Sequence, residues 1–133
     1  MPSTSLRFAP PVRDAALQKL QSLIDANPGI KLAVITSSDG FEVAAWPVKP
    51  VSQRIAAMSS SLQALSEAIA REAGLKDSRS LVIESENGTI VVLGLTTTPR
   101  MSLAVVASGE ELLGRLLWLA RNCCSELERT LGS

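Results

Sequence analysis

Residues 51–74 place the strongest constraint on the fold, because they predict one long helix. This segment has no proline or glycine before Gly74, and it is rich in Ala, Gln, Glu, Arg and Leu, which favour helix. Pro50 before it and Gly74 at its end are natural helix boundaries. Apolar side chains recur at steps of three and four residues, which predicts one apolar side that packs against a sheet. These side chains are Val51, Ile55, Met58, Leu62, Leu65, Ile69 and Ala73.

A second stripe on the same helix consists of small side chains. Its members recur at steps of four, three and four residues: Ala57, Ser61, Ala64 and Ala68. Two interpretations are open. Alanine is a good helix former on a solvated surface, and small side chains also let another backbone come close. We favour the second interpretation, in which a helix from a twin subunit or a partner packs on this stripe.

Hydrophobic periodicity and turn residues predict the order helix, two strands, central helix, three strands, helix. The predicted ranges are 12–26, 30–37, 41–46, 51–74, 81–86, 89–95, 101–107 and a last helix that Ser108 opens. Asp39-Gly40 and Asn87-Gly88 stand between pairs of strands and predict hairpins with type I′ turns. Several strands, such as residues 90–93, have apolar side chains on both faces, so both faces of the sheet are expected to be covered.

The last helix has a clear start signal and a clear buried side. Ser108, followed three residues later by Glu111, has the form of a capping box. Trp118 lies about 140° from the centre of the apolar stripe, counting 100° per residue. The ring therefore either contacts a partner or lies over neighbouring surface or under the N-terminal tail. The expected buried stripe is Leu113, Leu116, Leu117, Ala120, Cys124, Leu127 and Leu131.

Length and charge limit the class of protein. The 133 residues suit a single domain, which we place at 12–133, after a flexible tail of residues 1–11 that is rich in Pro, Ser and Thr. The 13 basic and 13 acidic residues are spread along the chain, which argues against a nucleic-acid surface. No apolar run approaches the ~20 residues that span a bilayer, so membrane insertion is not expected. The adjacent Cys123 and Cys124 fit buried, reduced thiols and predict a cytoplasmic protein.

The usual residues of catalytic and cofactor sites are missing from the sequence. It has no histidine, no GxxxxGK[ST] and no GxGxxG, so His-based catalysis and the common phosphate-binding loops lack their signatures. Glu84 and Glu86 are two residues apart and point the same way on a strand. Charges at such a position commonly block unwanted pairing at a sheet edge. We therefore expect no catalytic, metal or cofactor site, and no enzyme.

Four stretches of the chain resemble the Roadblock domain family, which includes the dynein roadblock light chains and bacterial partners of Ras-like GTPases. The central helix, entered by AAM and SSSL, stands between a DG turn and an NG turn. The resemblance extends over roughly residues 12–131. The stretches are VITSSDGFEVAA at 34–45, RIAAMSSSLQALSEAIARE at 54–72, LVIESENGTIVVLGL at 81–95 and SLAVVASGEELLGRLLWLAR at 102–121.

This resemblance implies an α/β (α+β) three-layer sandwich. A five-stranded antiparallel sheet would carry the central helix on one face and the two terminal helices on the other. The resemblance also implies a non-enzymatic, homodimeric regulator or scaffold that binds a Ras-like small GTPase. In the implied homodimer the third strands pair and the central helices lie side by side. With the small-residue stripe, the expected interface includes Leu81, Val82, Ile83, Glu84 and Ser85.

Partner-binding residues are expected on the side of the central helix away from the apolar stripe. They are Gln53, Ser60, Glu67 and Arg71. Trp118 is added from the last helix, because Trp is a common interface anchor. Two other functions stay open: a ligand-sensing module of the profilin-like or PAS-like kind, which needs a cavity with convergent polar groups, and a scaffold for a partner other than a GTPase.

Overall fold

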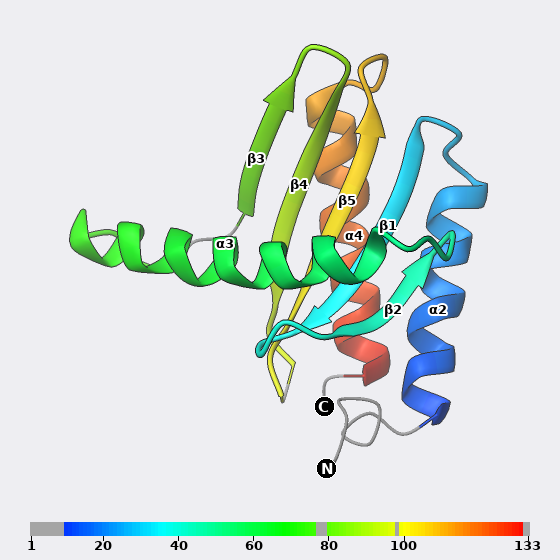
Figure 1. Cartoon of the computed structure of the whole chain (residues 1–133), viewed down its shortest axis with the longest axis horizontal. Coiled ribbons are helices and arrows are strands. Elements are labelled where there is room, and N and C mark those ends of the chain that lie inside the picture. The colour runs from blue at the N-terminus through cyan, green and yellow to red at the C-terminus, as the bar shows by residue number, and fades with distance from the viewer. Residues whose placement is uncertain (1–9, 77–79, 98, 132–133) are drawn as a thin grey trace.

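The computed structural model describes residues 10–76, 80–97 and 99–131, and its elements follow the predicted order (Figure 1). The α/β architecture with the order α-β-β-α-β-β-β-α is confirmed. Pro10 and Pro11 form the start of the first helix, and the rest of the predicted tail lies outside the described residues. The elements are α2 (Pro10–Asp25), β1 (Ile30–Ser37), β2 (Glu42–Trp46), α3 (Ser52–Glu72), β3 (Ser80–Ser85), β4 (Gly88–Leu95), β5 (Met101–Ser108) and α4 (Leu113–Leu131).

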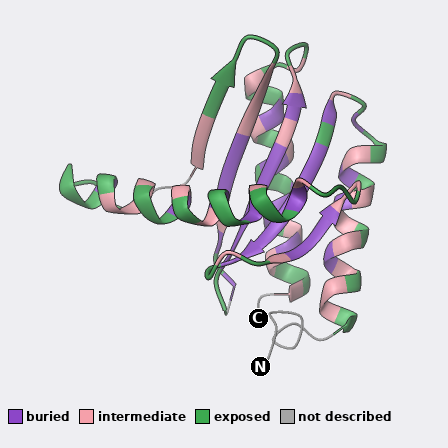
Figure 2. Ribbon diagram, in the orientation of Figure 1, coloured by how far each residue is buried: buried purple, intermediate pink, exposed green. Residues whose placement is uncertain are grey.

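The five strands form one antiparallel sheet in the order β2-β1-β5-β4-β3. The middle strands are rich in β-branched residues and are covered on both faces, so they are almost entirely buried (Figure 2). Val34 of β1 lies between Ala45 of β2 and Ala104 of β5. Among the described strands β3 pairs only with β4, which leaves its other side as a sheet edge.

The helices cover the two faces of this sheet unequally. α2 and α4 pack on one face and on each other, over a large core that includes Leu20, Ile35, Leu103 and Leu116. α3 crosses the opposite face, where a smaller cluster joins Leu32, Val34, Ala45 and Ala56. The predicted three-layer arrangement is confirmed. Figure 1 shows that the C-terminal half of α3 extends past β3, beyond the edge of the sheet.

The predicted orientation of α3 is wrong. Its sheet-facing side is small and polar rather than apolar, and its buried residues are Ser52, Ala56, Ser59, Gln63 and Ala70. Met58, Leu65 and Ile69 of the predicted buried stripe are instead 58%, 58% and 61% exposed. Small side chains let α3 lie close to the sheet, and its projecting half has no sheet beneath it to cover the longer ones.

The predicted start of the last helix is also wrong. Ser108 is the last residue of β5, and its backbone N–H donates to the carbonyl of Gly29 at 2.8 Å. α4 begins only at Leu113. Glu111 pairs with the Arg115 guanidinium four residues later instead of closing a capping box. The extended position of Ser108 prevails over the local capping signal, because the carbonyl of Gly29, just before β1, satisfies the backbone N–H that a capping box would satisfy.

Neither hairpin turn is of the predicted type. A type I′ turn needs positive φ at both central residues. Within the described residues only Gly40, at 90°, and Gly74, at 76°, have positive φ. In the second hairpin Gly88 pairs with Ser85 as the first residue of β4. The dipeptides therefore marked the hairpins correctly but did not specify the turn geometry.

Candidate protein-interaction surfaces

One side of α3 forms an exposed row of large apolar side chains, which we call the apolar flank: Met58, Leu62, Leu65 and Ile69. Leu62 is half-buried, and the other three are more than half exposed. Ile55, at the start of the same side, and Val106 of β5 both pack against the small core cluster. Exposed apolar surface of this kind marks an interaction site more often than not when it is contiguous.

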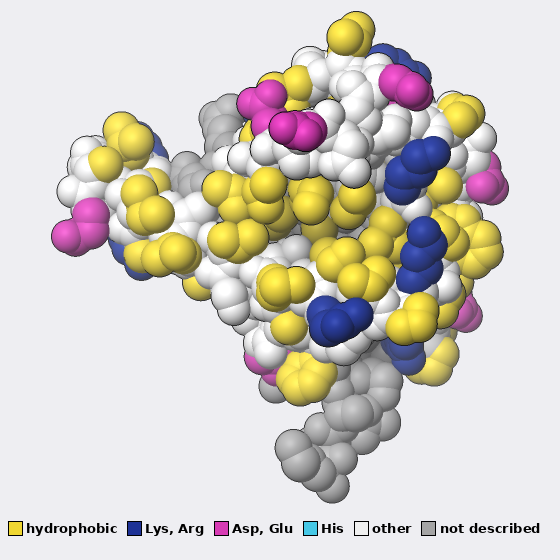
Figure 3. Space-filling view, turned by 45° about the horizontal axis from the view of Figure 1, so that its top comes forward, with side chains coloured by type: hydrophobic (Ala, Val, Ile, Leu, Met, Phe, Trp, Pro, Cys, Tyr) yellow, Lys and Arg dark blue, Asp and Glu magenta, His cyan; other side chains and the backbone are white. Residues whose placement is uncertain are grey.

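The sheet next to the apolar flank continues the same apolar surface. Ile83 of β3, Ile90 of β4 and Val106 of β5 lie in one cross-strand row. Ile83 is 38% exposed, and Ile90 and Val106 are half-buried. Figure 3 shows hydrophobic side chains extending from the projecting end of α3 across this part of the sheet. A second polypeptide lying here would contact both elements.

The unpaired edge of β3 borders this apolar surface. The five residues predicted to pair across a two-fold axis all lie in this edge strand: Leu81, Val82, Ile83, Glu84 and Ser85. An edge strand presents free N–H and C=O groups that can pair with another strand. The position at the edge is as expected, and pairing across a dimer stays a prediction.

The opposite side of α3 is polar and is hydrogen-bonded to neighbouring loops. The Gln53 amide donates to the carbonyl of Gly40 at 3.2 Å and accepts from the backbone N–H of Glu42 at 3.1 Å. Ser60 donates to the carbonyl of Ser38 at 2.9 Å. These bonds join α3 to the turn between β1 and β2.

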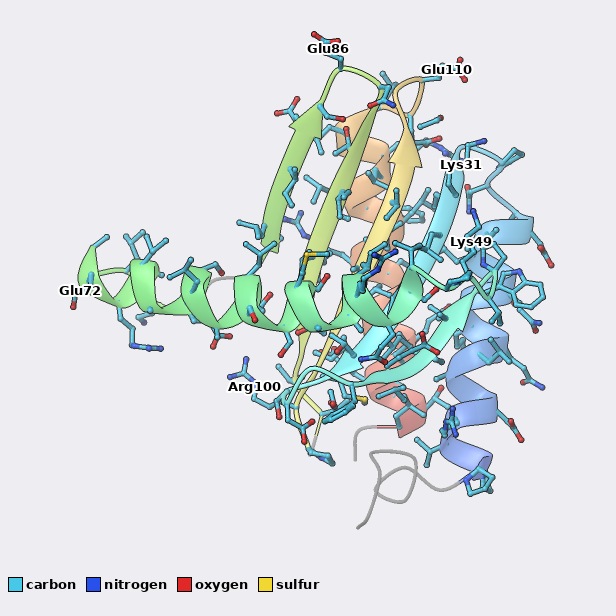
Figure 4. All side chains as sticks on the ribbon, in the orientation of Figure 1. Lys31, Lys49, Glu72, Glu86, Arg100 and Glu110 are labelled. Atoms are coloured by element: carbon cyan, nitrogen blue, oxygen red, sulfur yellow. The ribbon has the colours of Figure 1, made fainter. Side chains whose placement is uncertain are left out.

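Farther along the same side, Glu67 is the centre of a polar cluster. Its Oε2 accepts from Gln63 Nε2 at 3.2 Å and from Arg100 Nη2 at 3.0 Å. Arg100 is largely exposed and Glu67 is not. Figure 4 shows Arg100 beside the middle of α3 and Glu72 at its far end. Three of the predicted partner-binding residues, Gln53, Ser60 and Glu67, thus share one side of α3.

Two hollows follow this polar side. A pocket of about 90 Å³ lies between α3 and the first residues of β5, and Gln63, Glu67 and Arg100 are part of its lining. A groove of about 510 Å³ runs between α3 and the β1–β2 turn and is lined by hydroxyl groups, small side chains and Phe41. The larger hollow is an open groove on the surface, which favours contact with a macromolecule over enclosure of a small ligand.

The remaining predicted residues occupy other places. The small-residue stripe faces away from the sheet: Ala57, Ser61 and Ala64 are exposed, and Ala68 is half-buried. Arg71 is exposed on the projecting end of α3. Trp118 is 64% exposed on α4, which covers the other face of the sheet, so it does not join the α3 residues in one site.

Sequence reasoning missed the exposure of the apolar flank and the roles of Gln63 and Arg100. The sequence did contain a signal for the exposure of the apolar flank, because Ser52, Ser59 and Gln63 recur on one side of α3 between alanines. A side of this kind can approach a sheet more closely than a row of Leu and Met. No signal pointed to Arg100, because it lies 33 residues from Glu67 in the sequence.

The thiols and acidic groups of the described residues form no recognisable reactive centre. Cys123 and Cys124 are free and buried in α4. Burial, and then the charge of Glu126, raise the pKa of Cys123 to about 11, and burial also raises the pKa of Cys124. Within the described ranges no group of three or more Cys, Asp or Glu side chains could hold a metal ion, and none of the helices there has the length and apolarity to cross a bilayer.

Comparison with known proteins identifies the fold. The family model described as Roadblock/LC7 domain matches residues 16–107, more than half of the chain. The Roadblock/LC7 domain from Streptomyces avermitilis superposes with a TM-score of 0.77 at 22% identity, covering 86% of this chain and 95% of that one. A structure of MglB with a tetrameric arrangement gives 0.78 at 19% identity and covers 90% of each chain.

Profilin IA of Acanthamoeba castellanii shares the architecture at a lower TM-score of 0.65, with 14% identity, covering 86% of this chain and 97% of that one. None of the curated protein sequences matches the chain. At these identities the solved structures establish the fold alone.

Proposed function

Because the chain belongs to the Roadblock/LC7 domain family, we propose that it is a non-enzymatic, homodimeric regulator or scaffold that binds a Ras-like small GTPase. The observation that carries the proposal is an apolar flank on α3 that adjoins the unpaired edge of β3. A monomer leaves both features in contact with water. A second copy of the chain would cover both at once.

The geometry of α3 supports a two-fold dimer through β3. If the two β3 edges pair antiparallel, the half of α3 that extends past β3 lies over the partner's sheet (Figure 1). The row of Ile83, Ile90 and Val106 would then be covered by the second α3. The two helices would lie side by side, with the apolar flank and the small-residue stripe available for their contact.

The partner surface of the dimer is proposed on the polar side of α3. Gln53 and Ser60 would lie there beside the open groove at the β1–β2 turn, with Glu67 and Arg71 farther along α3. Trp118 would offer a separate contact on the other face. One asymmetric GTPase on a two-fold surface occupies one orientation at a time, so one GTPase per dimer is the expected ratio.

The dimer is tested by light scattering and sedimentation of the purified protein. We expect a dimer, and Ala64→Glu should weaken it by overpacking and by an unpaired charge. Ala64 is exposed in the protomer, so circular dichroism should show an unchanged fold. A native wild-type protein that stays monomeric at all concentrations would disprove the dimer.

The partner is tested by calorimetry with small GTPases of the source cell, each loaded in turn with GDP and with a non-hydrolysable GTP analogue. The protein alone is expected neither to bind nor to hydrolyse GTP, whereas the dimer should bind a GTPase. If no loaded GTPase binds, the regulator proposal fails, and a scaffold for another partner becomes the better description.

A further inference from the structure

The rotation of α3 about its own axis is held by hydrogen bonds on its polar side. We call these residues the polar latch: Gln53, Ser60 and Glu67. Gln53 and Ser60 bond to the β1–β2 turn, and Glu67 bonds to Arg100 in the loop before β5. Three separate points along two-thirds of the helix are thereby attached to the body of the protein.

The burial pattern of α3 opposes the orientation that these bonds hold. Met58, Leu65 and Ile69 face water, while Ser52 and Gln63 face the sheet. Ser52 Oγ and Gln63 Oε1 are buried without a hydrogen-bond partner among the described residues. Unpaired buried polar atoms and exposed apolar side chains both disfavour a state. A turn of about one third of a revolution, at 100° per residue, would bring Met58 and Leu62, which precede the projecting half of α3, to the sheet.

We infer that the polar latch consists of positioning residues that keep the apolar flank turned outward, ready for a second copy of the chain. Without the latch, α3 turns Met58 and Leu62 towards the sheet of its own protomer, and the apolar flank no longer forms one surface for the dimer. This inference rests on the proposed homodimer, but the orientation of α3 can be measured in a monomer.

The first experiment follows α3 through the oxidation of Met58 by hydrogen peroxide, measured by mass spectrometry. Ile83→Lys, on the apolar sheet surface, supplies a monomeric background. In that background Met58 is exposed and should oxidise rapidly, while the buried Met101 should oxidise slowly and serve as the internal reference. Adding Gln53→Ala, Ser60→Ala and Glu67→Ala should slow the oxidation of Met58 several-fold. Equal rates with and without the latch would overturn the inference.

The second experiment measures the dimer dissociation constant by sedimentation. The triple latch variant should dimerise at least tenfold more weakly than the wild type, although its substitutions lie on the other side of α3 from the apolar flank. Ser60→Thr keeps the hydroxyl group, and in a variant that retains Gln53 and Glu67 it should preserve dimerisation. Arg71→Ala is the matched control, because Arg71 is exposed on the same helix and its side chain makes no hydrogen bond or ion pair with another described residue.

The outcomes separate the two proposals. An unchanged dissociation constant in the latch variant would overturn the link between the latch and dimerisation. A wild type that never dimerises would disprove the proposed dimer, while the oxidation rates of Met58 still decide whether the latch holds α3.

Discussion

At the scale of single residues, burial controls the chemistry of the two thiols. Cys123 and Cys124 lie in the core beneath α4, where a thiolate would lose its hydration. The thiolate is the nucleophilic form of cysteine, so both side chains are inert at neutral pH. Both side chains belong to the large core that α2 and α4 form on this face of the sheet.

The raised pKa of Cys123 predicts how stability changes at alkaline pH. The unfolded thiol ionises near its ordinary pKa of 9.0, whereas the folded thiol keeps its proton until about pH 11. The free energy of unfolding should therefore fall between these values, by up to about 3 kcal/mol from this residue. Urea denaturation at pH 8.5 and 10.5 measures the fall, which should be smaller in Cys123→Ala. Equal falls in both proteins would contradict the assignment.

Trp118 is 64% exposed on α4. We expect Trp118→Ala to change the free energy of unfolding by less than about 0.5 kcal/mol, as is usual for surface positions. If the ring anchors a partner, the same variant should lose at least tenfold in partner affinity, measured by calorimetry. Leu112→Ala, at another exposed apolar residue ahead of α4, is the matched control. Unchanged affinity would show that Trp118 only covers surface.

At the scale of elements, α3 differs from α2 and α4 in which kind of side chain faces the sheet. α4 buries Leu116, Ala120 and Leu127 against the sheet, as the apolar period predicts. α3 places small and polar side chains on the sheet and leaves large apolar ones exposed. The exposed apolar side chains of such a helix are buried only when a second surface packs on them. We propose that this surface is the α3 of a second copy.

Substitutions in the apolar flank and in the small-residue stripe of α3 should affect dimerisation to different extents. Leu65→Ser removes a large side chain from the apolar flank, and Ala57→Ser alters the small-residue stripe by one hydroxyl group. Both residues are exposed in the protomer, so neither change should unfold it. We expect Leu65→Ser to raise the dimer dissociation constant at least tenfold and Ala57→Ser to raise it much less, as measured by sedimentation. The reverse order would assign the contact to the small-residue stripe.

At the scale of the whole molecule, the unpaired β3 edge and the projecting α3 lie on the same end of the sheet (Figure 1). Because they lie at the same end, a second copy related by one two-fold axis would pair with the β3 edge and also cover the projecting half of α3. The two terminal helices lie on the far face and stay outside this contact. The charged side chains of Glu84 and Glu86 stand near the tip of the β3–β4 hairpin, where they limit pairing with unrelated strands.

A dimer of this kind should make thermal stability depend on protein concentration, because association stabilises the folded state by mass action. The unfolding midpoint Tm of the wild type should rise by several degrees across a hundredfold increase in concentration, measured by differential scanning fluorimetry. Ile83→Lys should show a Tm that does not change with concentration. A concentration-independent Tm in the wild type would argue for a monomer.

Much of the fold follows from local patterns in the sequence. Every described helix and strand was predicted within a few residues except the start of α4, and β1 was predicted with its observed bounds. These features depend on hydrogen bonds and turns between residues that are close in the chain. The polar residues Gln53, Ser60 and Glu67 could also be placed on one side of α3 from helical spacing alone.

Packing between distant segments sets which side of α3 faces the sheet. The apolar period of residues 51–74 shows that one side is apolar, but it does not show what covers that side. Close approach favours Ala56 and Ser59 beneath the helix, and the sheet ends at β3 before it can cover Leu65 and Ile69. Contacts between distant segments also place Ser108 at the end of β5 instead of at the start of a helix. They likewise bring Arg100 to Glu67, 33 residues away in the sequence. Local patterns in the sequence therefore specify the elements and their order, whereas packing between distant segments specifies which residues remain exposed for a second molecule.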